Sequence, residues 1–151
     1  MRLVKIALVC IALSGCNQGE REIVVVPSNY IGRVMIVFDQ KNGMEPLYND
    51  GKRVYNIPQN GILKTKFSPN PGWIGTPDFY YDKISPNKML QYEADPRALP
   101  VATVVAYGVI AGSTSDKNNI IRFLEYYVGN KAQIDSAYEK APGLDIIKLI
   151  R

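Results

Sequence analysis

The chain has 151 residues, in which 18 lysine and arginine residues stand against 14 acidic residues and no histidine is present. Because there is no imidazole, Ser-His-Asp and Cys-His catalysis and the usual zinc sites are excluded. The formal net charge of +4 is mild, so the sequence predicts no nucleic-acid partner, which would need clustered basic side chains.

The first residues, MRLVKIALVCIALSGC, are typical of a secretory signal peptide. Arg2 and Lys5 supply the positive charge that precedes an apolar run of eight residues from Ile6 to Leu13. That run is too short for a membrane-spanning helix, which needs about 20 apolar residues. The final residues, LSGC, resemble the lipobox of bacterial lipoproteins, in which the cysteine thiol accepts a diacylglyceryl group before cleavage.

We therefore expect residues 1–15 to be removed as a lipoprotein signal peptide and residues 16–21 to form a tether that begins with acylated Cys16. Acyl chains on Cys16 would hold the protein on a membrane face outside the cytoplasm. Asn17 stands where an aspartate would resemble an inner-membrane retention signal, which favours the outer membrane if the source has one. Since Cys10 leaves with the signal peptide and Cys16 is acylated, no disulfide is expected.

Residues 22–67 show the period of two that predicts β-strands. The run EIVVV is mostly β-branched, and GRVMIVFDQ alternates, with Val34, Ile36 and Phe38 on one face of a half-buried strand. The next two predicted strands, RVYNI and ILKTKF, are separated by PQNG. Because Asn-Gly is a strong turn signal, the pair at 60–61 is expected to join these two strands as a hairpin.

Residues 68–100 are rich in proline and are predicted to be mostly loop, with short strands around Phe79–Asp82 and Met89–Tyr92. Aromatic side chains gather here and form a candidate binding surface, because flat rings stack on sugars or receive a peptide, and tyrosine is favoured at interfaces. These candidate residues are Trp73, Phe79, Tyr80, Tyr81 and Tyr92. The alternative is that the rings close the core beneath a long loop, which is the commoner arrangement of aromatic side chains.

The last third of the chain is expected to contain further strands and a helix. VATVVAYGVIAG at 101–112 is almost entirely apolar, as in a strand buried on both faces. The segment 118–129 is rich in β-branched and aromatic residues, which favours a strand paired with 101–112, although its spacing also fits a helical stripe. Asn130 and Gln133 form a capping-box pattern that predicts a helix near 131–141, and LDIIKLI is expected to add a last strand.

These elements predict one mainly β domain over residues 22–151, a single β-sandwich of the transthyretin or immunoglobulin type with seven to nine short strands and one C-terminal helix. The motifs VPSNYIGRVMIVF, NDGKRVYNIPQNGILKTKF, FYYDK and RFLEYYVGNKAQ resemble those of an uncharacterised family of small lipoproteins common in Bacteroidetes. The resemblance implies a transthyretin-like body behind a lipid anchor, and it implies no catalytic residue.

No metal or cofactor site is predicted, because the acids and amides of the turns FDQKNG and YNDGK lack the spacing of a calcium loop. Asp78 with Asp82, and Glu93 with Asp95, are the acids that flank the aromatic stretch, and glycosidase chemistry would need such a pair to converge. The leading hypothesis is a lipid-anchored, non-catalytic binding or structural module that contacts an envelope protein or a glycan. The alternatives are a carboxylate-dependent envelope hydrolase acting on glycans, and a small inhibitor or exclusion lipoprotein.

Overall fold

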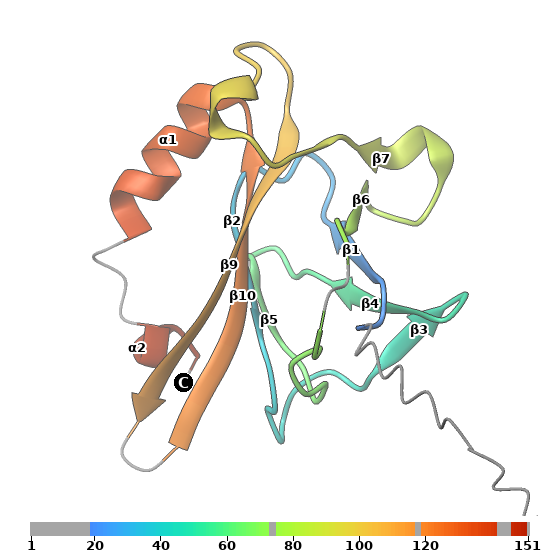
Figure 1. Ribbon diagram of the computed structural model, residues 1–151, viewed down its shortest axis with the longest axis vertical. Helices are drawn as coiled ribbons and strands as arrows, with labels where there is room; N and C mark the ends of the chain where they lie inside the picture. Colours follow the sequence, from blue (N-terminus) through green and yellow to red (C-terminus); the bar gives the residue numbers. More distant parts are fainter. Residues whose placement is uncertain (1–18, 73–74, 117–118, 142–145, 151) are drawn as a thin grey trace, which may run out of the picture.

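Two five-stranded sheets face each other, and two helices lie on the outer side of the second sheet (Figure 1). The computed structural model describes residues 19–72, 75–116, 119–141 and 146–150. The strands are β1 (Glu22–Val26), β2 (Gly32–Val37), β3 (Leu47–Asn49), β4 (Lys52–Asn56), β5 (Ile62–Lys64), β6 (Asp78–Tyr81), β7 (Met89–Leu90), β8 (Tyr92–Glu93), β9 (Val105–Asp116) and β10 (Asn119–Gly129). The helices are α1 (Lys131–Lys140) and α2 (Ile146–Ile150), with single 3-10 turns η1 (Pro86–Lys88) and η2 (Pro96–Ala98). The predicted mainly β sandwich is confirmed, with ten strands in the described part of the chain instead of seven to nine.

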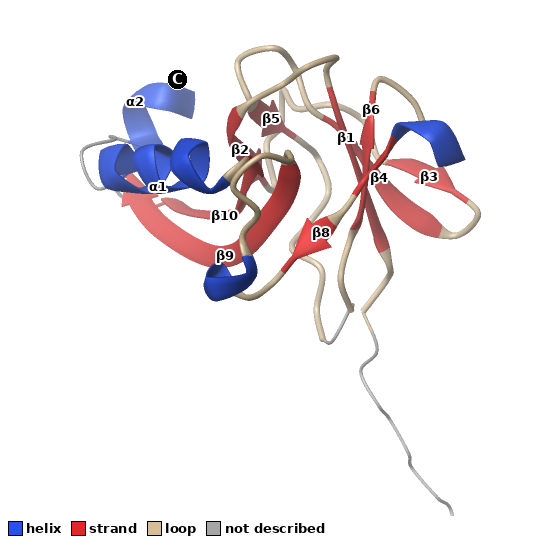
Figure 2. Cartoon of the chain, turned by 90° about the horizontal axis from the view of Figure 1, so that it is seen from above, coloured by secondary structure: helices blue, strands red, loops and turns tan. Residues whose placement is uncertain are grey.

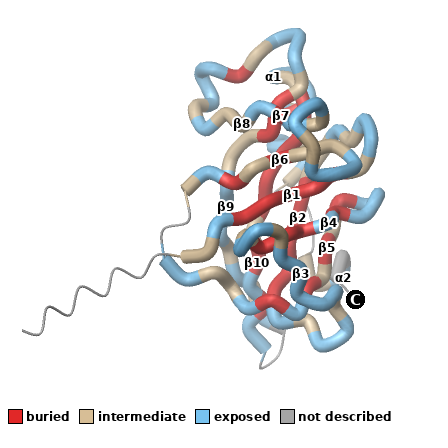
Figure 3. The backbone as a smooth tube through the Cα atoms, turned by 90° about the vertical axis from the view of Figure 1, so that its right-hand side faces the viewer, coloured by how far each residue is buried: buried red, intermediate tan, exposed pale blue. Residues whose placement is uncertain are grey.

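The first sheet has the strand order β3-β4-β1-β6-β7 and is built around β1. This strand pairs in parallel with β4 on one side and with β6 on the other. All five of its residues are buried, as Figure 3 shows. Val24 and Val26 belong to the core between the sheets, whereas Ile23 and Val25 pack against Val54 on the outer face. The predicted strand is confirmed, and its unbroken apolar run reflects burial on both faces.

The second sheet has the order β5-β2-β10-β9-β8. Along β2, Val34 and Ile36 face the core between the sheets, as their alternation predicts. The opposite face is buried as well, because Met35 and Val37 pack in a second cluster to which Ile146 of α2 belongs. The expectation that this strand is half-buried is therefore wrong, since a helix covers its other face.

β9 and β10 form a long antiparallel hairpin, which confirms the strand predicted for 118–129 and its pairing with the preceding strand. The preceding strand starts later than predicted and is not buried on both faces, because Val109 is 53% exposed and Val101 is 80% exposed. A bulge interrupts the pairing where residues 108–109 lie opposite Tyr126. Gly108 has a φ of +70°, the left-handed conformation that glycine supplies in this kind of bulge.

α1 begins with the predicted capping box, in which the Asn130 side chain accepts from the backbone N–H of Gln133 and the Gln133 side chain accepts from the backbone N–H of Asn130. Its one buried residue, Ile134, packs against Tyr127 of β10. The last predicted strand is wrong, because LDIIKLI supplies α2 instead. A helix suits this position since it brings Ile146 and Ile147 onto the apolar outer face of β2 and β10. Among the described residues, no helix is long and apolar enough to cross a membrane.

The predicted hairpin of β4 and β5 is also wrong. β4 lies in the first sheet, whereas β5 lies in the second and pairs in parallel with β2. The turn at Asn60 and Gly61 is present, with the Gly61 N–H donating to the Pro58 carbonyl at 2.9 Å, but it carries the chain from one sheet to the other. The Asn-Gly pair predicts that the chain turns at this point. Which strand β5 then pairs with depends on how the apolar side chains are divided between the two sheets.

A second crossing between the sheets occurs at residues 89–93. β7 pairs with β6 of the first sheet, and β8 pairs with β9 of the second, so that only Gln91 separates the two pairings. This short segment joins the sheets at one edge and gives the sandwich the shape of a partly open barrel, which Figure 2 shows from above. β8 reaches only the first residues of β9, Ala106 and Tyr107, and the rest of that edge is left open by the strands described here.

Gly61 offers a direct test of how the crossing between the sheets is packed. An added Cβ would lie 2.0 Å from the Tyr30 hydroxyl oxygen and 2.4 Å from the Arg33 carbonyl oxygen. Gly61→Ala is therefore expected to lower the free energy of unfolding by about 3–4 kcal/mol, from overpacking and an unfavourable positive φ together. Gly51 has a similar φ of +73° and nothing within 4 Å, so Gly51→Ala should cost only about 1 kcal/mol. Urea unfolding of both variants measures the difference, and equal losses would contradict the packing described.

Candidate functional site

A cleft of about 430 Å³ opens between the second sheet and the chain that follows β5. It lies along the outer half of the β9–β10 hairpin, where β8 no longer covers β9. Its walls are largely apolar, with backbone and small side chains on the β9 side. The lining residues are Glu22, Phe38, Pro69, Asn70, Gly72, Ala111, Gly112, Ser113, Arg122, Phe123 and Leu124.

Glu22, the first residue of β1, is the acidic residue among these lining residues and is only 2% exposed. Its Oε1 accepts the Tyr55 hydroxyl at 3.1 Å and the Asn70 side-chain amide at 3.0 Å. Its Oε2 has no hydrogen-bond partner in the described part of the chain. Burial raises the pKa of the Glu22 carboxyl, while the hydrogen bonds from Asn70 and Tyr55 and the charge of Arg53 oppose that shift.

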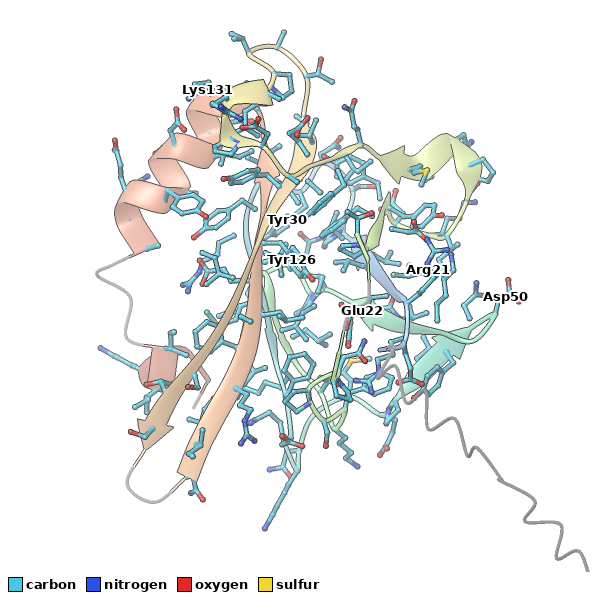
Figure 4. All side chains as sticks on the ribbon, viewed as in Figure 1. Arg21, Glu22, Tyr30, Asp50, Tyr126 and Lys131 are labelled. Carbon is cyan, nitrogen blue, oxygen red and sulfur yellow. The ribbon has the colours of Figure 1, made fainter. Side chains whose placement is uncertain are left out.

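Tyr126 of β10 faces the interior from the sheet opposite Glu22, as Figure 4 shows. The ring is fully buried and meets Phe79 edge to face, with ring centroids 5.2 Å apart. Its hydroxyl also has no partner among the described residues. Burial raises the pKa of this phenol, and the nearby Glu22 carboxyl raises it further, so the hydroxyl stays protonated. Two buried polar atoms, one on each sheet, thus have unused hydrogen-bonding capacity.

Asn70 fixes the start of the folded body beside the cleft. Its Oδ1 accepts the backbone N–H of Glu20 at 3.0 Å, and its Nδ2 donates to the backbone carbonyl of Glu20 at 2.6 Å. The Glu20 carboxylate is ion-paired with Arg53, whose Nη1 donates to the Ser68 carbonyl at 2.7 Å. One amide side chain therefore positions both the entry of the chain and, through Glu22, the acid of the cleft.

Arg122 supplies positive charge at the mouth of the cleft. It lies opposite Ser113 in the β9–β10 pairing, and both residues are exposed. Its backbone carbonyl accepts from Phe38, which continues the sheet, but its guanidinium has no ion pair within the described ranges. An exposed, unpaired guanidinium is well suited to a carboxylate or phosphate.

The four described aromatic residues of the proposed binding surface, Phe79, Tyr80, Tyr81 and Tyr92, do not lie on one face. Phe79 is fully buried and stacks on Tyr92, with ring centroids 5.9 Å apart. Tyr81 and Tyr92 are half-buried against the same inner core, whereas Tyr80 packs on the outer face of the first sheet. Phe79, Tyr81 and Tyr92 therefore pack in the core or against it, and Tyr80 does not. Trp73 and Cys16 lie outside the described residues.

The acids that flank the aromatic stretch have ordinary partners. Asp78 pairs with Lys52 at 2.7 Å, and Asp82 accepts from Ser28 and lies 3.3 Å from Lys88. Asp95 caps η2 and pairs with Arg97, and Glu93 accepts from the backbone N–H of Asp95. Neither pair lines the cleft.

A second cavity, of about 310 Å³, lies on the outer face of the first sheet between β3 and the loop after β6. Asp82 is its acidic lining residue, and Leu47, Tyr48 and Ile84 give it exposed apolar walls. Among the described residues, one carboxyl group lines each of these two cavities, Glu22 in the first and Asp82 in the second. In the part of the chain that the structure describes, no three acidic or cysteine side chains are grouped for a metal ion.

Sequence reasoning missed three polar residues of the cleft lining, Glu22, Asn70 and Arg122, and it also missed the buried hydroxyl of Tyr126. One signal was available for Glu22, which is the only charged residue of the run EIVVV, in a strand otherwise fit for burial on both faces. No local pattern distinguishes Asn70, whose partner Glu20 is 50 residues away along the chain, or Arg122, which meets the other lining residues of the cleft only in the folded protein.

A family model matches residues 18–138 of this chain. The chain belongs to DUF6843, a family of unknown function. The part that matches the DUF6843 model includes every strand described above and most of α1, and it ends before α2. The cleft residues all lie within it.

The DUF6843 chain is also similar in structure to the crystal structure of a protein named "Putative Lipoprotein from Bacillus anthracis". The TM-score is 0.52 with 13% sequence identity, over 74% of this chain and 71% of that one. At this identity the likeness shows a shared fold. The comparison with curated proteins gave no match.

The raised pKa of Glu22 predicts a specific dependence of stability on pH. In the unfolded chain this carboxyl ionises near pH 4.5, whereas in the folded protein it holds its proton to higher pH, so ionisation favours unfolding as pH rises above about 4.5. Glu22→Gln keeps an acceptor for Tyr55 and Asn70 and removes the titration. The variant should therefore gain stability relative to the wild type between pH 4.5 and 7.5, measured by urea unfolding. Glu139→Gln, on the exposed side of α1, controls for loss of a surface charge. If the difference in free energy of unfolding between Glu22→Gln and the wild type stayed the same across this pH range, the prediction would be contradicted.

The two tyrosines around Glu22 should respond differently to loss of their hydroxyl groups. Tyr126→Phe removes a buried hydroxyl without a partner, so the free energy of unfolding should stay within about 0.5 kcal/mol of the wild type or increase. Tyr55→Phe removes a donor to Glu22 and should cost about 1–2 kcal/mol. Thermal and urea unfolding measure both. A larger loss for Tyr126→Phe than for Tyr55→Phe would show that Tyr126 has a partner in solution.

Proposed function

We propose that this protein is a lipid-anchored, non-catalytic binding module of the bacterial cell envelope, which uses the cleft beside its N-terminal tether to hold a partner. The observation that carries the proposal is the short path from Cys16 to the clamp that Asn70 forms on Glu20. Four residues span at most about 14 Å when fully extended. Acylation of Cys16 would therefore hold Glu20, which the cleft residue Asn70 binds, within about 14 Å of the membrane surface.

Two further observations support an envelope address. The sequence MRLVKIALVCIALSGC has the charge, apolar length and small residues of a lipoprotein signal. The structural neighbour bears the name "Putative Lipoprotein from Bacillus anthracis". The proposal also includes an outer-membrane location, if the source has an outer membrane. It further includes a relationship to the small lipoproteins of Bacteroidetes that have a transthyretin-like body.

The absence of catalysis is proposed from the arrangement of the acids. A retaining or inverting glycosidase needs two carboxyl groups separated by about 5–10 Å on either side of the scissile bond. The lining of the cleft contributes Glu22, whose raised pKa would suit a proton donor, but it contributes no second carboxyl group among the described residues. A hydrolase would lose its activity in Glu22→Gln. An inhibitor or exclusion lipoprotein would use the same cleft for binding.

Lipidation is tested by expressing the full chain in a bacterial host grown with an alkyne-labelled fatty acid. The wild type should incorporate the label and should accumulate as an unprocessed precursor when the lipoprotein signal peptidase is inhibited. Cys16→Ser should abolish the label, because it removes the acyl-accepting thiol. Cys10→Ser is the matched control: it removes the other cysteine of the chain and should leave labelling unchanged. Label that persists in Cys16→Ser, or an unlabelled wild type, would overturn the anchor.

A further inference from the structure

Beyond Tyr107, no strand of the described residues pairs with the edge of β9 that faces away from β10. On β10, the Arg122 carbonyl accepts from Phe38, so the backbone of Arg122 points toward β2. Ser113 is the residue opposite Arg122, and Ala111 is opposite Leu124. Since backbone groups alternate in direction along an antiparallel pair, Ala111, Ser113 and Ser115 direct their N–H and C=O groups away from β10.

The same edge is already used by a strand nearer the start of β9. The Ala106 N–H donates to the Gln91 carbonyl at 2.9 Å, where β8 pairs with β9. β8 ends opposite Tyr107, and among the described residues no other strand pairs with β9 on this side. The bulge at Gly108 lies at the point where this pairing stops. This edge of β9 therefore pairs with a strand, β8, along only part of its length.

The free part of this edge lacks the side chains that commonly block an edge strand. Natural edge strands are commonly blocked by lysine, proline or inward-facing charge. Residues 109–115 of β9 read VIAGSTS and contain none of these. Val109 is 53% exposed and Ile110 is 38% exposed. An uncharged and partly apolar edge of this length favours the addition of another strand.

The edge also forms one wall of the cleft. Ala111, Gly112 and Ser113 line it on one side, and Pro69, Asn70 and Gly72 line it on the other. A strand added to β9 would lie about 4.8 Å from it and would therefore occupy the cleft. Side chains on one face of such a strand would point toward the apolar wall formed by Phe38 and Leu124.

The positive charge of Arg122 at the mouth of the cleft favours a bound strand that carries an acidic side chain. The guanidinium of Arg122 is exposed and has no ion pair among the described residues, and its neighbour across the pairing is the small Ser113. An acidic side chain on the added strand can reach Arg122 over Ser113 and pair with it.

We propose that the cleft binds an extended, apolar peptide segment of another envelope protein, which adds to β9 along Ala111–Ser115 and pairs an acidic side chain with Arg122. This inference rests on the proposed function as a binding module, and it names the class of partner. Main-chain hydrogen bonds to the edge supply affinity, and the cleft and Arg122 supply selectivity.

The test begins with a phage-displayed library of linear 12-residue peptides, selected against the purified lipidated protein in detergent micelles. We expect enriched peptides to alternate apolar residues and to contain an acidic residue. The strongest peptide is then labelled, and its Kd is measured by fluorescence anisotropy. Hydrogen exchange should show protection of the amides of Ala111, Ser113 and Ser115 when the peptide is bound.

Ser113→Pro removes one edge donor and should weaken binding about tenfold or more, since it deletes a main-chain hydrogen bond and crowds the added strand. Proline is tolerated where the N–H of an edge strand faces solvent, so the variant should fold. Ser113→Ala keeps the N–H and is the matched control, with a Kd within about twofold of the wild type. Arg122→Gln should weaken the binding of the acidic peptide and should leave the Kd of a neutral version of that peptide unchanged.

Three outcomes would overturn the proposal: no enriched peptide with measurable affinity, equal binding by Ser113→Pro and Ser113→Ala, or protection confined to another surface. Self-association that Ser113→Pro abolishes would make a second copy of this chain the occupant and would also overturn it. Fatty-acid labelling of the same preparation does not depend on any of these four outcomes. A failed peptide test would therefore not contradict the lipid anchor of the proposed function.

Discussion

β1 lies between two parallel neighbours, and its five residues are buried on both faces. On the inner face, Val24 and Val26 contribute about 1.5–3 kcal/mol each by burial, and Ile23 and Val25 contribute in the same way on the outer face. β4 and β6 are short, and each depends on β1 as a pairing partner. The strand also sets the position of Glu22, since its first residue must lie at the end of the sheet that borders the cleft.

The cleft follows from the way in which the sheets are joined. Because residues 89–93 serve both sheets, neither β7 nor β8 is longer than two residues. β9, which has twelve residues, extends well past the end of β8. Closing the barrel would need a longer β8, and without it the outer half of the hairpin borders solvent. The bulge at Gly108 marks the point where the covered and the open halves of β9 meet.

Local patterns predicted the elements that depend on neighbouring residues. The period of two in GRVMIVF, the β-branched run of β1 and the capping box of α1 each reflect a preference that the segment itself contains. The predictions that failed involve distant parts of the chain. The residues IIKLI of the last predicted strand form α2, which packs on the apolar outer face of β2 and β10. β5 joins β2 because the turn at Gly61 crosses between the sheets. The site was missed for the same reason, since Asn70 contacts Glu20 and Glu22 from about 50 residues away.

The clamp of Asn70 on Glu20 has a mechanical consequence. A pull on the residues before Glu20 enters the fold through this clamp and then runs along β1, the central strand of its sheet. Because β1 is bonded in parallel on both sides, such a force loads its hydrogen bonds in shear, so that many must break together. An edge strand pulled from its end would instead peel away one bond at a time. The N-terminal end of the folded body is thus held against unravelling by many hydrogen bonds at once.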